Sequence, residues 1–427
     1  MSIDCVPLSF RLPDSAGPAI MRKRLVHPLL ATSLPTTIMI SCKRGLFSLP
    51  PDQHYLNCAY MSPLSKRVEA AGLAGIRRKA VPADITPDDF FKGPDAVRRL
   101  FAELIGVSAP ERIAIVPSVS YGISTFAKNT MVSQGQNVIT LLDQFPSHVY
   151  PWRRLCRETG AELKVVIPAS PGPGRAESWN SALLEAIDAD TAVVAVPNVH
   201  WTDGTRFDLE AVAARARDVG AALIVDGTQS IGAMPFDVRR IQPDAVVCAG
   251  YKWLGGPYSI GAVYCGTRYD DGVPLEEGWI ARTGSDDFSR LVDYQDEYRD
   301  GAVRYDVGEV SNFILIPMFL AALEQLAEWG VDNVASYCRR LTARLTVDLL
   351  EAGFSVTDER WRCGHMFGFR VPAGYDQAAL RERLGAEKVS VALRGNAIRV
   401  APHLYNDEGD MEALRKSLAL PWPRAGP

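Results

Sequence analysis

The sequence predicts an α/β fold in which a mostly parallel sheet of seven strands lies between helices, followed by a smaller α+β unit. Short apolar segments recur between residues 113 and 264, and amphipathic helical stretches separate them. The 427 residues are enough for two domains that share a large core. Because the segments are apolar almost throughout, both faces of the sheet should be buried, which is typical of parallel sheets. Ligands of such sheets bind beyond the carboxyl ends of the strands.

The predicted strands of the large sheet are, in chain order, IAIVP, NVITLL, ELKVVIP, TAVVAVP, ALIVD, AVVCAG and GAVYCG. Two long helical stretches, 312–329 and 331–352, should then link the large domain to a smaller one, whose strands come from MFGFRVP, VSVALRG and AIRVAPHLY. We therefore divide the chain into an arm (1–45), a large domain (46–315) and a small domain (316–427). The first part of the large domain is expected to pack with the small domain.

The composition excludes several classes of protein. The formal net charge is −4, and no stretch combines clustered Lys and Arg with stacking aromatic residues, so a nucleic-acid partner is not expected. The eight cysteines include no C-x-x-C pair, and the six histidines have no metal-ligand spacing. These patterns argue against a metal site and a disulfide framework, and they favour a reducing cytoplasm.

Residues 21–42 begin with basic residues and continue into an apolar run, which resembles a secretory signal segment. Two prolines interrupt the run, and it is too short to span a bilayer. We favour a flexible arm, or an extension upstream of a start near Met39, over export, and we expect no membrane partner. The fold should begin at about Leu46.

Lys252 and Asp226 carry the strongest chemical indication. Lys252 lies in AGYKWLGGP, between an apolar strand and a glycine-rich turn, and Asp226 ends the apolar strand ALIVD. Both side chains should therefore lie at the same edge of the sheet. A lysine in this position can form a Schiff base with the aldehyde of pyridoxal phosphate, and an aspartate can keep the ring nitrogen of that cofactor protonated.

Three further segments could hold the rest of such a cofactor. In VPSVSYGIS a helix begins after a strand, so Ser118, Val119 and Ser120 suit a phosphate, although simple N-capping is an equal alternative. Phe145 follows another strand and could stack on the pyridine ring, or belong to the core. Gln229 can reach the phenolic oxygen, or satisfy a local turn.

Arg399 lies inside an apolar strand, where a guanidinium group is costly unless it meets an anion. We favour a bidentate clamp on a substrate carboxylate over an internal salt bridge. His200 and His365 could act as acid or base, although each alone is more often structural. The acidic residues between 286 and 297 are interpreted as a solvated loop, so no metal is predicted.

These motifs together resemble the class V aminotransferase family of pyridoxal phosphate enzymes, which includes cysteine desulfurases, kynureninases and isopenicillin-N-epimerase-like proteins. The resemblance runs from about Tyr55 to the C-terminus and rests on YLNCAYMSP, PSVSYGIS, DQFPSHVYPW, the TDG turn at 202–204, VDGTQSIG, GYKWLGGPYSIG and IRVAPHLYN. It implies the type I fold of pyridoxal-phosphate-dependent transferases. It also implies a homodimer in which each active site is completed by the partner chain.

Carried over by motif, the resemblance implies that Lys252 is the Schiff-base lysine, that Asp226 is the partner of the ring nitrogen and that Gln229 lies next to the phenolate. It also implies that Ser120 binds the phosphate and that Arg399 clamps the substrate carboxylate. Phe145 and Tyr251 resemble residues of kynureninases that stack on the ring and contact the phosphate. Trp279, in EEGWIAR, resembles a kynureninase tryptophan that reaches the phosphate site of the neighbouring subunit.

The chain also departs from the subfamilies that it resembles. VSVALRGNAIRV contains no cysteine where desulfurases have their nucleophile, and Cys363 lies well upstream. Gln229 and His148 stand where kynureninases have histidine and aspartate. Glu309 stands where desulfurases have a threonine near the partner's phosphate. Persulfide-forming desulfuration is therefore not favoured.

We predict an enzyme that acts on an α-amino acid, most plausibly a lyase that catalyses β-elimination or Cβ scission, with Lys252 as proton shuttle. Transamination and epimerisation remain open, as does a regulatory protein that binds the cofactor without turnover. A nicotinamide-dependent dehydrogenase is disfavoured because G-x-G-x-x-G is missing. The predicted lining of the substrate pocket is Tyr60, His200, Trp201, Trp279, Arg282 and His365.

Overall fold

The computed structural model describes residues 40–169, 172, 174–372, 374–394 and 397–420, and by their contacts these residues belong to one compact unit. Most of the predicted arm and most of the signal-like segment, residues 1–39, lie outside the described residues. Among the described helices, none combines the length and apolar character needed to cross a bilayer.

The large sheet has the seven predicted strands, in the spatial order β2-β8-β7-β6-β5-β3-β4. All of them run parallel except β8, which is antiparallel to both of its neighbours. The α/β fold with a mostly parallel seven-stranded sheet is thereby confirmed. The strands are β2 (Ile113–Val116), β3 (Asn137–Leu141), β4 (Glu162–Val166), β5 (Thr191–Pro197), β6 (Ala222–Asp226), β7 (Ala245–Ala249) and β8 (Gly261–Cys265).

Helices cover both faces of this sheet, because successive side chains of each strand point to opposite sides. On β6, Leu223 and Val225 face the core that includes α2, α5, α6 and α8, whereas Ala222 and Ile224 face the core that includes α3 and α4. The helices of this region are α1 (Lys66–Lys79), α2 (Asp89–Leu104), α3 (Val119–Lys128), α4 (Tyr150–Thr159), α5 (Arg175–Ala186), α6 (Leu209–Val219), α7 (Val238–Ile241) and α8 (Leu315–Trp329).

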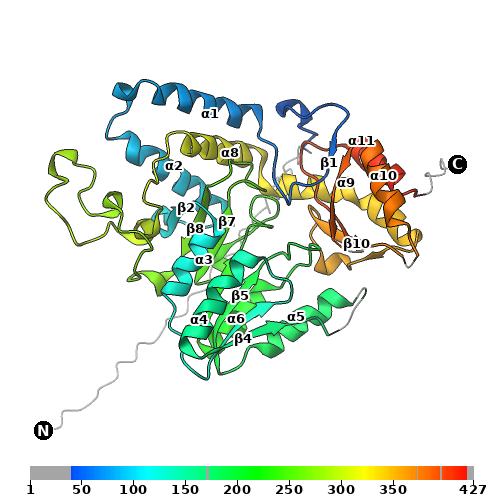
Figure 1. Cartoon of the computed structure of the whole chain (residues 1–427), viewed down its shortest axis with the longest axis horizontal. Helices are drawn as coiled ribbons and strands as arrows, with labels where there is room; N and C mark the ends of the chain where they lie inside the picture. Colours follow the sequence, from blue (N-terminus) through cyan, green and yellow to red (C-terminus); the bar gives the residue numbers. More distant parts are fainter. Residues whose placement is uncertain (1–39, 170–171, 173, 373, 395–396, 421–427) are drawn as a thin grey trace, which may run out of the picture. The chain divides into compact units, whose positions relative to one another are not determined.

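The C-terminal part is built around a four-stranded antiparallel sheet in the order β12-β13-β10-β9. Helices α9, α10 and α11 lie close to β10 in Figure 1 and share one core with the sheet. The elements are α9 (Val331–Glu351), β9 (Ser355–Val356), β10 (Phe367–Arg370), α10 (Gln377–Ala386), β11 (Val389–Ser390), β12 (Ala392–Arg394), β13 (Ala397–Val400) and α11 (Glu408–Ser417).

The segment VSVALRG does not form the single strand that the sequence predicts. Its first part, β11, pairs in parallel with β1 (His54–Tyr55), and its second part, β12, pairs with β13. The chain divides because two different strands offer backbone partners on its path. Helix α8 packs against α1 and α2, as Figure 1 also shows, so it lies with the large sheet, and the domain boundary at 315/316 stays a prediction.

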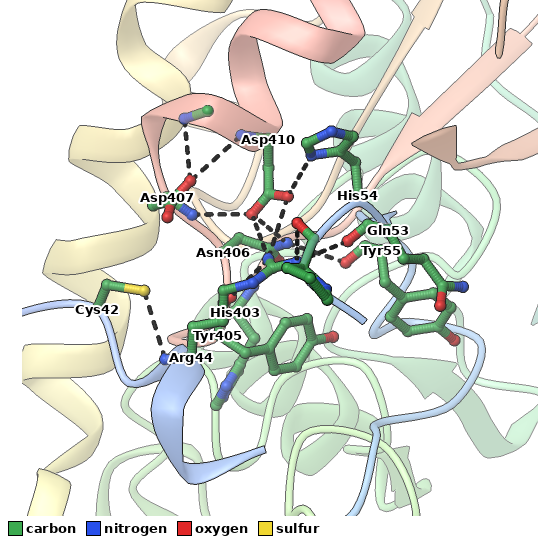
Figure 2. A network of polar contacts seen from close by, with 12 residues as sticks. Cys42, Arg44, Gln53, His54, Tyr55, His403, Tyr405, Asn406, Asp407 and Asp410 are labelled. Carbon is green, nitrogen blue, oxygen red and sulfur yellow. Dashed lines mark hydrogen bonds and ion pairs between the residues drawn. The ribbon is translucent and has the colours of Figure 1, made fainter. Parts of the chain in front are cut away.

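Residues 40–45, which the sequence places in the arm, pack against the C-terminal part. The backbone N–H of Lys43 donates to the carbonyl of Leu404 at 2.6 Å. Arg44 and His54 converge on the buried carboxylate of Asp410, with Arg44 Nη1 at 3.3 Å and His54 Nδ1 at 2.7 Å (Figure 2). A buried carboxylate needs such partners, and this need orders the chain before the predicted start at Leu46.

Candidate active site

A pocket of about 220 Å³ lies at the carboxyl edge of the large sheet. The segments that follow β2, β3, β5, β6 and β7 meet there, together with the residues that lead into β8. The topology explains this meeting, because the carboxyl ends of parallel strands share an edge and an antiparallel strand begins at that same edge. The predicted site residues that line the pocket are Val119, Ser120, Phe145, Trp201, Asp226, Gln229, Tyr251 and Lys252.

Lys252 is buried in the wall of this pocket and is only 7% exposed. Its Nζ lies 5.4 Å from the centroid of the Phe145 ring and 5.6 Å from that of Tyr251. Burial lowers the pKa of Lys252 to about 8, while the negative charge of Asp226 opposes this shift and the positive charge of Arg399 adds to it. A substantial fraction of the amine is therefore neutral and nucleophilic near physiological pH.

Asp226 ends β6 and reaches the pocket from the middle of the sheet. Its Oδ1 accepts the backbone N–H of Thr228 at 2.9 Å, which orients the carboxylate. Gln229 also lines the pocket, but its amide binds the protein at both ends. Its Nε2 donates to the carbonyl of Ala59 at 3.0 Å, and its Oε1 accepts the indole N–H of Trp253 at 2.8 Å.

Helix α3 begins at the pocket, so its first backbone N–H groups lie there. The N-capping interpretation holds for Ser118, whose Oγ accepts the N–H of Tyr121 at 3.1 Å. The hydroxyl of Ser120 lies 2.9 Å from that of Ser118. The two predictions for this segment are compatible. Ser118 caps the helix, while Val119 and Ser120 begin its first turn, where the helix N-terminus attracts an anion.

Arg399 is buried and bound to the protein at its guanidinium group. Its Nη2 donates to Oδ1 of Asn57 at 3.1 Å, and its Nη1 donates to the carbonyl of Trp201. Trp201 itself lines the pocket, and its ring packs edge-on against Phe145, with centroids 5.5 Å apart. Arg399 therefore lies directly behind the pocket wall.

The two histidines predicted to line the pocket do not reach it. His200 is buried between the hydroxyl of Thr202, 2.7 Å from Nδ1, and the carbonyl of Leu142, 3.1 Å from Nε2. His365 is buried against Trp253, and its Nε2 lies 2.8 Å from the carbonyl oxygen of Gln229. Burial lowers the pKa of His365 to about 4. Both rings are used in holding the fold, and their placement corrects the expectation from sequence.

Tyr60, Trp279 and Arg282 also lie outside the pocket of their own chain. The side chain of Tyr60 is 61% exposed. Trp279 packs on Phe90 and Phe288, and Arg282 pairs with Glu277 and stacks on Tyr298. These residues belong to exposed parts of the molecule, so their predicted role in substrate binding and across a dimer stays a prediction.

The sequence analysis missed several residues of the pocket wall, among them Thr228, Tyr258 and Ser259. Thr228 lies within the VDGTQS motif and could have been found from it. Tyr258 and Ser259 enter the pocket because β8 runs antiparallel to its neighbours, which brings its start to the same edge. Both residues lie within the GYKWLGGPYSIG motif, but strand direction cannot be read from an apolar run, so the motif alone did not indicate that they reach the pocket.

The pocket fits pyridoxal phosphate in each of its chemical features. An amine with a lowered pKa suits the aldehyde, a buried carboxylate suits the ring nitrogen, an aromatic face suits the ring, and a helix N-terminus with a serine hydroxyl suits the phosphate. Among the described residues, no cluster of His, Cys, Asp or Glu is arranged to hold a metal ion.

The fold and this set of side chains define a pyridoxal-phosphate-dependent enzyme of fold type I. The family follows from comparison with known proteins. Residues 88–421 match the family model of the class-V aminotransferases, and the chain belongs to this family.

Relatives and solved structures agree with this assignment. The chain is 28% identical over 316 residues to the uncharacterized aminotransferase YcbU of Bacillus subtilis, covering 74% of this chain and 80% of that protein. It is 27% identical over 244 residues to a cysteine desulfurase of an Enterobacter species, covering 56% and 58%. A C-DES mutant with glycine covalently linked to its PLP cofactor has the same fold, with a TM-score of 0.76 at 18% identity, covering 88% of this chain and 99% of that one. The cysteine desulfurase of Thermococcus onnurineus gives 0.72 at 19%, covering 89% and 97%.

The lowered pKa of Lys252 predicts how cofactor uptake depends on pH. Only the neutral amine attacks the aldehyde, and the neutral fraction grows by about tenfold per pH unit below the pKa. We expect the rate of uptake, followed by stopped-flow absorbance after removal of the cofactor, to rise up to a pH of about 8 and then to level off. A rate that continued to rise toward 10.5, the ordinary pKa of lysine, would show that burial does not perturb this amine.

Proposed function

We propose that this enzyme is a lyase that acts on an α-amino acid by β-elimination, with C–S bond cleavage as the favoured case. Transamination and epimerisation are the alternatives. The observation that carries the proposal is the meeting of a buried lysine and a buried aspartate in one pocket, beside the ring of Phe145. These groups suit a cofactor that weakens the bonds at the α-carbon of an amino acid by accepting electrons from it.

In this proposal Lys252 holds the cofactor covalently and Asp226 pairs with its ring nitrogen. Phe145 lies against the ring, Val119 and Ser120 bind the phosphate, and Gln229 and Tyr251 close the walls. When bound, pyridoxal phosphate supplies an electron-accepting ring next to the amino group of the substrate. Asp226, Gln229 and Lys252 are each more than nine-tenths buried in the pocket wall, so this part of the site is shielded from bulk water.

Two residues of this chain then act on the substrate. Once its amine is released, Lys252 moves a proton at the α-carbon, and its lowered pKa of about 8 suits both directions of transfer. Arg399 lies behind the wall and binds the substrate carboxylate if its guanidinium turns from the carbonyl of Trp201 toward the pocket. The kynureninase-like identities of Phe145 and Tyr251 are compatible with cleavage at Cβ as well.

Elimination with release of the sulfur product is favoured over transfer of sulfur to a protein thiol. None of the described cysteines lines the pocket. Cys363, which lies nearest in sequence to the position of the desulfurase nucleophile, is buried, and burial raises the pKa of its thiol to about 12. C-DES, whose structure is described as that of a cystine C–S lyase with its product cysteine persulfide, shares the fold with a TM-score of 0.74 at 19% identity.

A panel of amino acids separates the alternatives. We expect the purified enzyme to release ammonia, a keto acid and sulfide or persulfide from cysteine or cystine, while Lys252→Ala protein in the same assay releases none. Accumulation of pyridoxamine phosphate would identify an aminotransferase, and loss of optical rotation without ammonia would identify an epimerase. Binding of the cofactor without turnover of any amino acid would support a silent regulatory protein and contradict the proposal.

We also infer a homodimer in a reducing cytoplasm. The supporting feature is a second groove on the same chain, which Phe90, Trp279 and Glu309 line outside the first pocket. Trp279 is 38% exposed in this groove, where it packs on Phe90 and Phe288, and a partner subunit would cover it in the proposed dimer. Glu309 lies in this groove in place of the threonine that desulfurases have near the partner's phosphate, so in such a dimer that contact would be rearranged or absent.

A further inference from the structure

Trp253 is a buried tryptophan that directly follows Lys252 in the chain. It is only 1% exposed and does not line the pocket. Its indole N–H donates to Oε1 of Gln229 at 2.8 Å, so it contacts a residue that does line the pocket. The proposed function assigns Trp253 no role.

Two hydrogen bonds determine how the side-chain amide of Gln229 is oriented. An indole N–H can only donate, so the atom that Trp253 contacts is the oxygen of the amide. A backbone carbonyl can only accept, so the atom 3.0 Å from the carbonyl oxygen of Ala59 is the amide nitrogen, Nε2. A rotated amide would lose both bonds, because it would bring two donors together at Trp253 and two acceptors together at Ala59.

One N–H of Gln229 remains after these two bonds are formed. The Nε2 atom carries two hydrogens, and among the described residues its one hydrogen-bond acceptor is the carbonyl of Ala59. Gln229 is 5% exposed and lines the same pocket as Lys252 and Asp226. Because a buried donor without a partner is costly, this N–H needs an acceptor inside the pocket.

Neighbouring contacts hold Trp253 itself in place. The ring of His365 packs edge-on against its indole, with centroids 4.5 Å apart, and Nε2 of His365 donates to the backbone carbonyl of Gln229 at 2.8 Å. The turn after β6 comes close to Trp253 at Gly232, where φ is +95° and an added Cβ would lie 2.6 Å from the carbonyl oxygen of Trp253. Trp253, His365 and Gln229 therefore form one closely packed unit behind the pocket wall.

We propose that Trp253 is a positioning residue, which holds the amide of Gln229 so that its second N–H donates to the phenolic oxygen of pyridoxal phosphate. The inference rests on the proposed function. There Asp226 pairs with the ring nitrogen and the start of α3 binds the phosphate, so the phenolic oxygen is the acceptor that still lacks a donor. This oxygen lies on the ring carbon next to the one that carries the aldehyde, and Lys252 attacks that aldehyde.

Trp253→Phe tests the proposal in the full-length holoenzyme, because it keeps an aromatic ring and removes the donor. A donor to the phenolic oxygen stabilises its negative charge, most of all once the nitrogen that joins Lys252 to the cofactor has lost its proton. Without a fixed donor, that nitrogen should hold its proton more tightly. We therefore expect the pH midpoint of the visible absorbance of the bound cofactor to rise by about one unit, the order of one hydrogen bond to a charged group.

A double-mutant cycle shows whether Trp253 acts through Gln229. Gln229→Leu removes the amide and should itself raise the midpoint by at least as much as Trp253→Phe. In the Gln229→Leu protein, the additional change Trp253→Phe should then leave the midpoint where it is. The same rise in both backgrounds, or no rise in either, would overturn the inference.

Trp179→Phe is the matched control. Trp179 is also fully buried and its indole N–H also has a hydrogen-bond partner, but that partner is the carbonyl of Val166 on β4, at 3.0 Å. This control should leave the midpoint unchanged, and a rise as large as that of Trp253→Phe would contradict the inference. A wild-type protein that binds no cofactor would instead contradict the proposed function itself.

A measurement on the unmodified protein covers the case in which Trp253→Phe does not fold. In enzyme labelled with ¹⁵N in its glutamine side chains, we compare protein with and without pyridoxal phosphate. We expect one side-chain amide proton of Gln229, the one bonded to Ala59, to keep its resonance, and the other to move downfield when the cofactor binds. If the cofactor leaves both resonances unchanged, the inference is wrong.

Discussion

Changing Lys252 to alanine is expected to abolish turnover and the visible absorbance of the bound cofactor. Loss of proton transfer alone lowers rates by roughly 10²–10⁴-fold, and loss of the covalent attachment adds to this effect. Because Lys252 is a buried amine whose pKa burial lowers to about 8, its removal should not weaken the fold. Absorbance spectra, turnover and thermal melting of the purified variant measure the three expectations.

A lysine outside the pocket provides the control for this prediction. Lys128 donates from Nζ to the carbonyl of Pro274 at 2.8 Å and does not line the pocket, so Lys128→Ala should keep the absorbance and the activity. Reduction with borohydride followed by peptide mapping should label Lys252 in the wild type and in the control. Labelling of another residue, or absorbance retained in Lys252→Ala, would remove the basis of the proposed function.

Changing Arg98 to alanine is expected to cost about 3–5 kcal/mol of stability, the usual loss when one partner of a buried ion pair is removed. Arg98 on α2 pairs with the buried Asp306, and its Nε donates to the carbonyl of Ile113 at 3.1 Å. The Oδ1 atom of Asp306 accepts the N–H of Ile115 at 2.7 Å. The pair thus joins α2 to β2 and to the segment that follows Tyr305. Urea denaturation of the variant measures the loss.

The same helix provides the control, because Lys92 pairs with Asp88 on the exposed face of α2. Lys92→Ala should cost only a small fraction of the loss, since exposed ion pairs contribute little. Burial raises the pKa of Asp306 to about 6, and Arg98 opposes this shift. Removal of Arg98 raises this folded-state pKa further, while the unfolded state is unchanged, so the electrostatic part of the deficit should be present above a pH of about 6 and shrink as the pH falls below it, where Asp306 is protonated in both folded proteins. Equal losses in the two variants would contradict this account.

Much of the fold could be predicted from local patterns. The seven strands of the large sheet were predicted from apolar runs, and Lys252 and Asp226 were found because each directly follows or ends such a run. Loops at the carboxyl edge of a parallel sheet converge whatever their sequences. Residues such as Phe145 and Trp201, which follow strands in the same way, line the same pocket for this reason.

The structure corrects the placement of two histidines, the single strand predicted for VSVALRG and the predicted start of the fold. His200 and His365 have chemically suitable rings, but both are buried away from the pocket against other parts of the protein. Residues 40–45 are ordered by Arg44 and Asp410, which are 366 residues apart in the sequence. No local pattern contains information about partners at such a distance.

The sequence by itself determined the seven strands of the large sheet, the two long helices and the two residues of the predicted covalent site, because backbone geometry imposes a short period on apolar residues wherever a strand or helix forms. Only the tertiary structure decided which polar side chains face the pocket and which form hydrogen bonds elsewhere in the fold. Those properties depend on burial and on hydrogen-bond partners from distant segments, and both exist only after the sheet and its helices have packed together.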